Sequence, residues 1–159
     1  MQKIVPYLWF NDQAEEAMNH YTSIFPDSKV VSVSRYGDAG PGPKGTVMAA
    51  TFQLAGQEFM ALNGGPQFRF TEAVSLFVNC ETQAEVDELW KQLAAGGRAD
   101  QCGWLQDKYG LSWQIIPTAL GRMLGDKDPA KVNGVMQAML KMSKIDLEGL
   151  KRAYHGEGG

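Results

Sequence analysis

The amino-acid sequence predicts an α+β fold in which two βαβββ modules are followed by C-terminal helices. The main observation is an internal repeat: an apolar strand that ends in Asn and leads into an Ala- and Glu-containing helix occurs at residues 8–17 and again at residues 76–86. Each copy is followed by two strands around a Gly turn. Beyond Pro117, apolar residues recur at helical spacing instead. The duplicated pattern is more specific than any single motif, and two such modules can curl around a shared cavity.

The first module starts with an apolar strand at residues 8–10. A helix follows, indicated by apolar side chains at helical spacing: Ala14, Ala17, Met18 and Tyr21. Pro26 ends this helix. The later strands of the module lie at residues 51–54 and 59–62 around Gly56, and they follow a loop at residues 37–45 that contains four Gly and two Pro.

The second module repeats this order. Its first strand, residues 76–79, precedes a helix with apolar positions at Val86, Leu89, Trp90 and Leu93. A hairpin follows, with its bend at Asp107–Gly110 because Gly110 can adopt a positive φ. We expect the charges of Asp107 and Lys108 to be solvated in this bend, and we expect Trp104 and Trp113 to stack across the hairpin.

The C-terminal segment reads as helical. Asp128 followed by Pro129 is typical of a helix start, and Asp146 can cap a last helix. The whole chain, residues 1–159, is therefore expected to form one domain. It would consist of module one at about residues 1–66, module two at about 67–120 and a helical tail at about 121–159.

Composition restricts the classes of partner and the compartment. The chain has 159 residues, a net charge of −3 and no basic cluster, so we expect neither nucleic acid nor membrane as a partner. No apolar stretch approaches the roughly 20 residues that a membrane helix needs. Met1–Lys3 leads into a strand without a signal-peptide pattern, and Cys80 and Cys102 lack metal-type spacing, which together predict a cytoplasmic protein with free thiols.

The chain from Ile4 to about Tyr154 resembles the PhnB-like branch of the vicinal oxygen chelate superfamily (glyoxalase, bleomycin resistance and dioxygenase), the group labelled demethylubiquinone methyltransferase-like. The matching segments are Pro6–Phe10, Ala14–Ala17, Tyr21, Phe25–Pro26, Cys102–Trp104, Asp107–Gly110 and Trp113–Gln114. The resemblance implies the glyoxalase/bleomycin-resistance fold of paired βαβββ modules and assembly as a homodimer.

Metal-dependent members of this superfamily hold a divalent ion with side chains from the first and last strands of each module. The internal repeat assigns the last-strand positions to Met60 and Gln114, and the first-strand positions to Val5 or Pro6 and to Ala73 or Val74. One neutral amide cannot hold Zn²⁺, Ni²⁺ or Mn²⁺. We therefore expect no metal site and no other cofactor.

Strand parity predicts the wall of a ligand cavity, because side chains alternate between the two faces of a strand. The expected ligand-binding residues are Tyr7, Trp9, Met60, Leu62, Ser75, Phe77 and Gln114. This wall is apolar and aromatic with a few polar points, which suits a small aromatic or apolar organic molecule. The same side chains could instead fill a sheet core.

The leading hypothesis is metal-independent binding of such a molecule, with or without its turnover. Turnover would need a titratable group in the cavity, and the candidates are Glu58, Tyr7 and Cys102. Three alternatives remain open. They are methyl transfer to a quinone-like phenol, a metal-dependent glyoxalase or dioxygenase reaction, and a non-catalytic interaction protein whose core is filled by its own side chains.

Overall fold

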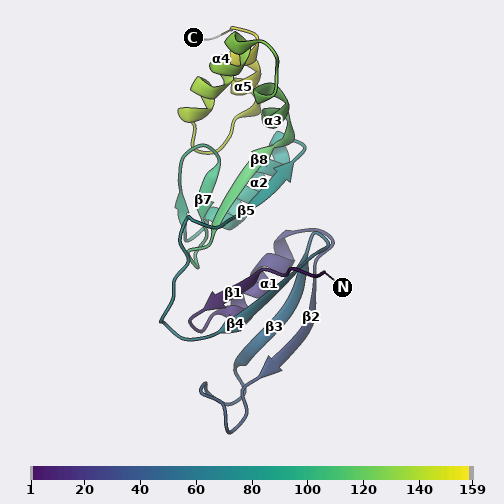
Figure 1. Ribbon diagram of the computed structural model, residues 1–159, viewed down its shortest axis with the longest axis vertical. Coiled ribbons are helices and arrows are strands. Elements are labelled where there is room, and N and C mark those ends of the chain that lie inside the picture. Colours follow the sequence, from purple (N-terminus) through teal and green to yellow (C-terminus); the bar gives the residue numbers. More distant parts are fainter. Residues whose placement is uncertain (1, 158–159) are drawn as a thin grey trace. The chain divides into compact units, whose positions relative to one another are not determined.

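The computed structural model describes residues 2–157, and its elements follow the predicted order (Figure 1). The first module consists of β1 (Tyr7–Phe10), α1 (Ala14–Ile24), β2 (Lys29–Arg35), β3 (Val47–Leu54) and β4 (Gln57–Asn63). The second consists of β5 (Ser75–Cys80), α2 (Gln83–Ala94), β6 (Arg98–Ala99), β7 (Trp104–Gln106) and β8 (Ser112–Pro117). Three helices follow, α3 (Thr118–Leu124), α4 (Pro129–Leu140) and α5 (Leu147–Tyr154). The predicted α+β fold of two βαβββ modules with C-terminal helices is confirmed.

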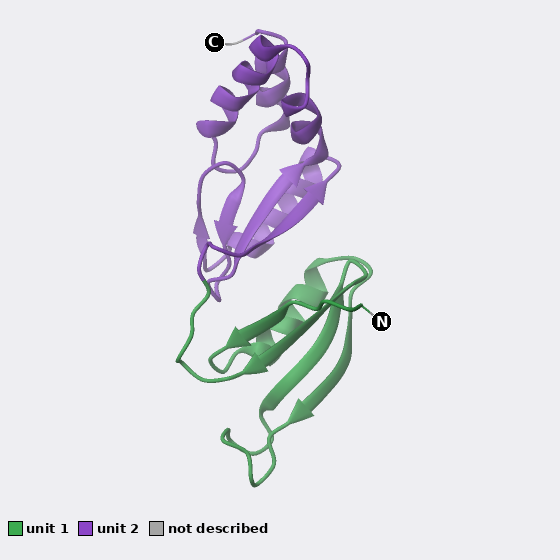
Figure 2. Cartoon of the chain, in the orientation of Figure 1, with its two compact units in different colours: residues 1–70 green, residues 71–159 purple. Residues whose placement is uncertain are grey.

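The chain divides into two compact units, residues 1–70 and residues 71–159 (Figure 2). Each unit has a four-stranded sheet, with strand order β1-β4-β3-β2 in the first and β5-β8-β7-β6 in the second. In each sheet the first strand of the module is parallel to the last, and the other neighbours are antiparallel. Among the described residues, no helix is long and apolar enough to cross a membrane.

In the first unit, α1 packs on one face of the sheet. Its buried side chains are Ala14, Ala17, Met18 and Tyr21, as the helical spacing predicts. No side chain of the preceding residue caps the helix; instead, the Ala14 amide donates to Oδ1 of Asn63 at the end of β4, at 2.8 Å. Buried strand residues complete this core, namely Leu8, Phe10, Val47, Ala50, Phe52, Leu54, Phe59 and Ala61.

In the second unit, α2 covers one face of the sheet. Thr82 caps the helix by accepting a hydrogen bond from the Glu85 amide at 3.2 Å. Val86, Leu89 and Leu93 are the buried positions of the helix. Trp113 and Ile115 of β8 are buried as well.

The bend between β7 and β8 differs from the expectation. Lys108 is exposed, but the Asp107 side chain is buried, with 3% of the residue exposed. Its Oδ1 accepts hydrogen bonds from the amides of Tyr109 at 2.9 Å and Leu111 at 3.1 Å, and its Oδ2 accepts from Nε1 of Trp113 at 2.9 Å. The prediction that both charges are solvated was wrong for Asp107, because its carboxylate closes the turn from inside.

The predicted stacking of Trp104 on Trp113 was also wrong. Trp104 pairs with Gln114 across the hairpin, whereas Trp113 pairs with Leu105. Since side chains alternate along a strand, the two indoles project from opposite faces of the sheet. Trp113 therefore belongs to the core beside α2, and Trp104 lies on the other face with Gln114.

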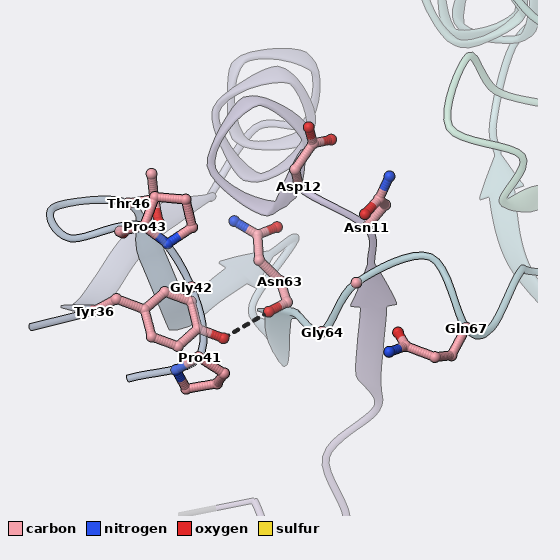
Figure 3. Close-up of a pocket in the computed structure, with 11 residues that line it drawn as sticks. Asn11, Asp12, Tyr36, Pro41, Gly42, Pro43, Thr46, Asn63, Gly64 and Gln67 are labelled. Carbon is pink, nitrogen blue, oxygen red and sulfur yellow. Dashed lines mark hydrogen bonds between the residues drawn. The ribbon is translucent and has the colours of Figure 1, made fainter. Parts of the chain in front are cut away.

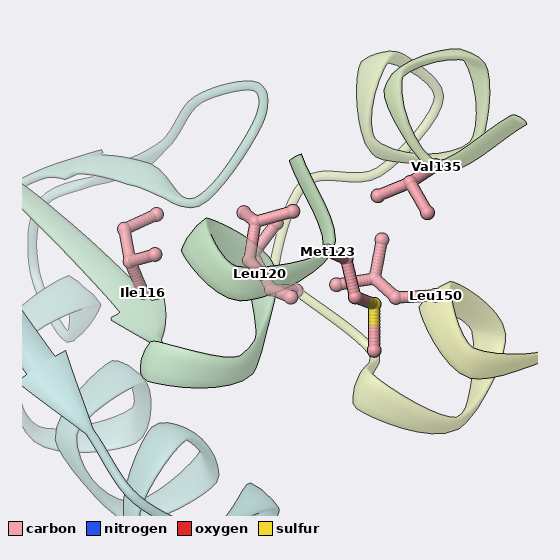
Figure 4. Packing of buried hydrophobic residues seen from close by; sticks show 6 residues of the cluster. Ile116, Leu120, Met123, Val135 and Leu150 are labelled. Atoms are coloured by element: carbon pink, nitrogen blue, oxygen red, sulfur yellow. The ribbon is translucent and has the colours of Figure 1, made fainter. Parts of the chain in front are cut away.

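The C-terminal helices have a hydrophobic core of their own (Figure 4). It is built from Leu120, Met123, Val135, Ile145 and Leu150, together with Ile116 of β8. Asp128 caps α4 by accepting from the Ala130 amide at 3.0 Å, and Pro129 occupies the first turn, as predicted.

Candidate functional site

The predicted ligand-binding residues lie on the sheet faces opposite α1 and α2. We call these surfaces the first open face (Tyr7, Trp9, Met60 and Leu62) and the second open face (Ser75, Phe77, Trp104, Ser112 and Gln114). The register supports this grouping, because Tyr7 pairs with Met60 and Phe77 pairs with Gln114. The predicted parity of these strands is consistent with their burial, since Leu8 and Phe10 are buried whereas half of Tyr7 and of Phe77 is exposed.

On the first open face, Trp9 is occupied by contacts within its own unit. Its Nε1 donates to the carbonyl of Gly65 at 2.9 Å. Its ring packs edge-on against Phe68 with the ring centroids 4.9 Å apart, and a Cβ on Gly64 would collide with it at 2.3 Å. Trp9 thus holds the segment that follows β4, while the half-exposed Tyr7 ring is the accessible aromatic group of this face.

On the second open face, Gln114 is held in place by Ser75. Nε2 of Gln114 donates to Oγ of Ser75 at 2.9 Å, and both residues are partly buried. The strands place Gln114 between Phe77 on β5 and Trp104 on β7. Phe77 is 53% exposed, which is unusual for a large apolar side chain. An oriented amide therefore lies between two aromatic residues.

Next to Gln114 on this face lies Ser112, which is fully buried. Within residues 2–157, its Oγ has no hydrogen-bond partner. A buried hydroxyl without a partner costs about 1–3 kcal/mol. Ser112 pairs with Ser75 on one side and with Gln106 on the other, so the unsatisfied hydroxyl lies among polar neighbours.

A charged cluster at the edge of this face was not predicted from the sequence. Arg98 binds Asp100, with Nε and Oδ1 2.8 Å apart, and Glu72, with Nη2 and Oε1 3.4 Å apart. Gln106 also donates to Oε1 of Glu72. The two carboxylates, Asp100 first, raise the pKa of the exposed Arg98 guanidinium. The sequence signal for this cluster is weak, because Glu72 precedes β5 and Arg98 lies in a two-residue strand.

The three candidate catalytic residues do not form one group. Glu58 is partly buried on β4, and its backbone amide and carbonyl bond to the side chain of Gln2. Tyr7 lies on the neighbouring β1 opposite Met60, whereas Cys102 belongs to the other unit. Cys102 has a φ of 60° and its amide is bonded to the Met142 carbonyl at 2.8 Å.

The other cysteine is inert by burial. Cys80 is completely buried at the end of β5. Desolvation, together with Glu85 and Glu81, raises the pKa of its thiol to about 12. A thiol with such a pKa supplies almost no thiolate at neutral pH.

The positions assigned to a metal by the repeat do not fit a divalent ion. Met60 and Gln114 lie where expected, but the residues opposite them are Tyr7 and Phe77. The expected first-strand positions precede β1 and β5 instead. A thioether, an amide, a phenol and a phenyl ring are poor ligands for Zn²⁺ or Mn²⁺. Among residues 2–157, no group of three or more His, Cys, Asp or Glu residues could hold a metal.

A separate cavity of about 520 Å³ lies in the first unit, where β1 and β4 end (Figure 3). Its lining residues come from three loops: Asn11, Asp12, Tyr36, Pro41, Gly42, Pro43, Thr46, Asn63, Gly64, Gly65 and Gln67. Both polar atoms of the Asn63 side chain are hydrogen-bonded here, since Oδ1 accepts from the Ala14 amide and Nδ2 donates to the carbonyl of Val47 at 2.9 Å. The Tyr36 hydroxyl donates to the Asn63 carbonyl at 2.8 Å. None of the predicted site residues lines this cavity.

Comparison with known proteins gives a consistent assignment. The model of the family described as 3-demethylubiquinone-9 3-methyltransferase matches residues 2–116. A solved structure from Bacillus cereus, described as a putative 3-demethylubiquinone-9 3-methyltransferase and PhnB protein, is 48% identical over 73% of this chain and 99% of its own, with a TM-score of 0.69.

A protein structure from Pseudomonas aeruginosa is 25% identical over 74% of this chain and 98% of its own, with a TM-score of 0.62. A glyoxylase/bleomycin resistance protein/dioxygenase domain from Frankia sp. EAN1pec is 19% identical over 74% of this chain and 92% of its own, with a TM-score of 0.49. No curated protein matches the chain. From the family model and the similarity to PhnB, we conclude that the chain belongs to the family described as 3-demethylubiquinone-9 3-methyltransferase, in the PhnB-like branch predicted from its sequence.

Proposed function

We propose that this protein binds a small aromatic organic molecule on the second open face without the help of a divalent metal ion. The observation that carries this proposal is the Gln114 amide, oriented by its 2.9 Å hydrogen bond to Ser75 between Phe77 and Trp104. Aromatic side chains offer a large apolar surface, and a few placed polar groups set the orientation of a ligand.

The hydrogen-bonding capacity of Gln114 indicates which ligand group would bind. One N–H of its Nε2 donates to Ser75, and this bond fixes the amide, whose Oε1 accepts no hydrogen bond from the described residues. A phenolic or other hydroxyl is the simplest group that could donate to it. We therefore propose a hydroxyl-bearing aromatic molecule as the ligand class.

Binding, rather than turnover, is what these groups support. The carboxylates at the edge of the second open face, Glu72 and Asp100, are both paired with Arg98, and Glu72 also accepts from Gln106. The candidates Glu58 and Tyr7 lie on the first open face instead. General acid–base catalysis needs a titratable group within hydrogen-bond reach of the reacting atom.

The proposal does not include methyl transfer, for which the family is named. Each sheet here is mixed, with a single parallel pair of strands. The Gly-rich strand-to-helix turn of doubly wound nucleotide-binding folds has no counterpart at the described β1–α1 junction, whose residues are Asn11, Asp12 and Gln13. S-adenosylmethionine is nevertheless a necessary probe in the test below.

We also propose that the protein works as a homodimer. Several large apolar side chains are more than half exposed: Ile4, Phe68, Val74, Phe77 and Leu140. An interface that covers exposed apolar side chains removes their surface from water, which favours association. Sedimentation velocity at micromolar concentration tests this point, and a monomer at every concentration would contradict it.

The binding test compares 4-methylphenol with toluene, which has the same ring and methyl group but no hydroxyl. NMR titrations of the full chain should give a tighter Kd for 4-methylphenol, and the Gln114→Leu variant should lose that preference. One hydrogen bond of about 0.5–1.5 kcal/mol corresponds to a ratio of roughly 2–10. Gln92→Leu, on the exposed surface of α2, is the matched control.

Thermal-shift measurements with S-adenosylmethionine and with MnCl₂ complete the test. A ligand that binds the native state at 100 times its Kd adds about 2.7 kcal/mol of stability. We expect neither compound to raise the melting temperature. Stabilisation by S-adenosylmethionine would favour methyl transfer, and stabilisation by Mn²⁺ would favour a metal-dependent reaction. Equal binding of both aromatic probes to wild type and Gln114→Leu would overturn the proposed site.

A further inference from the structure

The C-terminal helices lie beyond residue 116, where the family model ends. They do not form a detached tail. Ile116, the penultimate residue of β8, is 8% exposed because it packs into their hydrophobic core with Leu120 and Ile145 (Figure 4). By strand parity, Ile116 lies on the same face of the sheet as Gln114. The helices therefore cover one end of the second open face.

Hydrogen bonds hold the segment that joins α4 to α5 against the turn before β7 and against the start of α2. Gly103 allows this close contact, since a Cβ at this position would meet Cδ1 of Ile116 at 2.6 Å and Cγ1 of Ile145 at 3.0 Å. Two hydrogen bonds join the segment to the turn: the Cys102 amide donates to the Met142 carbonyl and the Gly103 amide to the Ser143 carbonyl, each at 2.8 Å. Two more join it to α2 through the Gln83 side chain. Nε2 of Gln83 donates to the Ile145 carbonyl at 2.9 Å, and its Oε1 accepts from the Leu147 amide at 2.7 Å.

The exposure of the strand residues differs between β8 and β5 at this end of the face. Gln114 is partly exposed, and Ile116, two positions along the same strand face, is 8% exposed. On β5, Phe77 is 53% exposed and Asn79, the partner of Ile116, is also exposed. The covered part is thus on the β8 side, and the face stays accessible along β5.

We propose that the C-terminal helices form an end wall of the ligand-binding face and limit the size of the ligand, with Ile116 as the residue that sets the limit. This inference rests on the proposed function. In the proposed pose, the hydroxyl of the ligand bonds to Gln114 and its aromatic ring lies over Phe77 and Trp104. A substituent directed along β8 meets Ile116 and the helices behind it. The site is therefore selective for compact phenols over those with a long alkyl chain.

The test measures Kd for 4-methylphenol, 4-propylphenol and 4-pentylphenol with the full-length protein. Each added methylene strengthens binding by about fourfold where it is buried without obstruction. The affinity of the wild type should rise by less than this for each methylene, or fall, as the alkyl substituent of the phenol becomes longer. Ile116→Ala should increase the preference for 4-pentylphenol over 4-methylphenol by roughly tenfold. Ile116→Val should change it in the same direction and serves if the alanine variant fails to fold.

Val135→Ala is the matched control, because Val135 is fully buried in the same helical core but lies on α4. It should leave the ratio of the two affinities unchanged. An equal ratio in wild type and both Ile116 variants, with 4-methylphenol bound by all of them, would overturn the wall and leave the proposed function intact. Failure of the wild type to bind any phenol would overturn the proposed function itself.

Discussion

Asp107 is the buried polar residue that ties the β7–β8 turn to the core. Its carboxylate accepts from two backbone amides and from the Trp113 indole. Hydrogen bonds to charged groups contribute more than neutral ones, and a buried donor left without an acceptor costs further free energy. The side chain therefore stabilises both the turn and the position of Trp113.

We predict that Asp107→Ala lowers the free energy of unfolding by about 2–4 kcal/mol. Lys108→Ala, at the exposed neighbouring position, should change it by less than about 0.5 kcal/mol. Urea denaturation of the two variants measures the difference. Equal stability of both variants would show that Asp107 has no structural role.

Gly103 and Gly110 form a natural matched pair. Both have a strongly positive φ, 85° and 89°, but a Cβ on Gly103 would collide with Ile116 whereas none of the described atoms lies within 4 Å of a Cβ on Gly110. Gly110→Ala should cost about 1–2 kcal/mol from the backbone conformation alone.

We predict that Gly103→Ala costs this amount plus about 1–3 kcal/mol for overpacking against the C-terminal helices. Chemical denaturation of the two variants isolates the packing contribution. If Gly103→Ala were no more destabilising than Gly110→Ala, the close contact between this turn and Ile116 would not contribute to stability.

At the level of elements, Tyr154 connects α5 to the turn between α3 and α4. Its hydroxyl donates to Oδ2 of Asp126 at 2.5 Å, and Nζ of Lys131 lies 4.3 Å from its ring centroid. The hydrogen bond lowers the pKa of Asp126 below 3.8 and raises the pKa of Tyr154 above 10.0. The contribution of Asp126 to the stability of the fold is thus present above pH 3.8, and it is lost as the pH falls through the lowered pKa of the folded state.

The contribution of Tyr154 has the opposite sign. It is present below pH 10.0 and is lost as the pH rises through the raised pKa. We therefore predict that Tyr154→Phe flattens the dependence of the melting temperature on pH at both the acidic and the alkaline end. The phenylalanine ring retains its packing against Lys131. Parallel curves for wild type and variant would mean that the hydrogen bond does not form in solution.

The sequence predicted these elements to different degrees. The sequence located α1 and its buried face from the helical spacing of Ala14, Ala17, Met18 and Tyr21, because a helix with a single apolar stripe can pack on a sheet in only one orientation about its axis. The alternation along β1 and β8 identified the faces for the same reason. The position of Trp104 was misjudged, since hairpin register depends on turn geometry, and the Asp107 carboxylate turns inward to bind the Trp113 indole.

The contacts that the sequence did not predict share one physical cause, which is that they join residues far apart in the chain. Arg98 lies 26 residues from Glu72, and Ile145 lies 62 residues from Gln83. No local periodicity records such pairs. The alignment of the repeat placed the first-strand positions near Val5 or Pro6 and near Ala73 or Val74, whereas the register places Tyr7 and Phe77 opposite Met60 and Gln114, because the register of parallel strands is set in three dimensions.

For the molecule as a whole, we propose that the second open face binds aromatic ligands between a fixed Gln114 amide and the C-terminal helices. Three of the four tryptophans lie at places that distinguish the possible sites. Trp104 lies on the face itself, and the Trp113 indole is buried against Asp107. Trp9 belongs to the first unit, where its indole N–H donates to the Gly65 carbonyl.

The most direct test is a titration of the ¹⁵N-labelled protein with 4-methylphenol, following the four indole N–H signals. We predict that the Trp104 signal shifts in a saturable manner while the Trp113 signal stays in place. A saturable shift of Trp9 alone would move the site to the first open face. A Trp104 signal that remains unchanged at millimolar phenol would contradict the account.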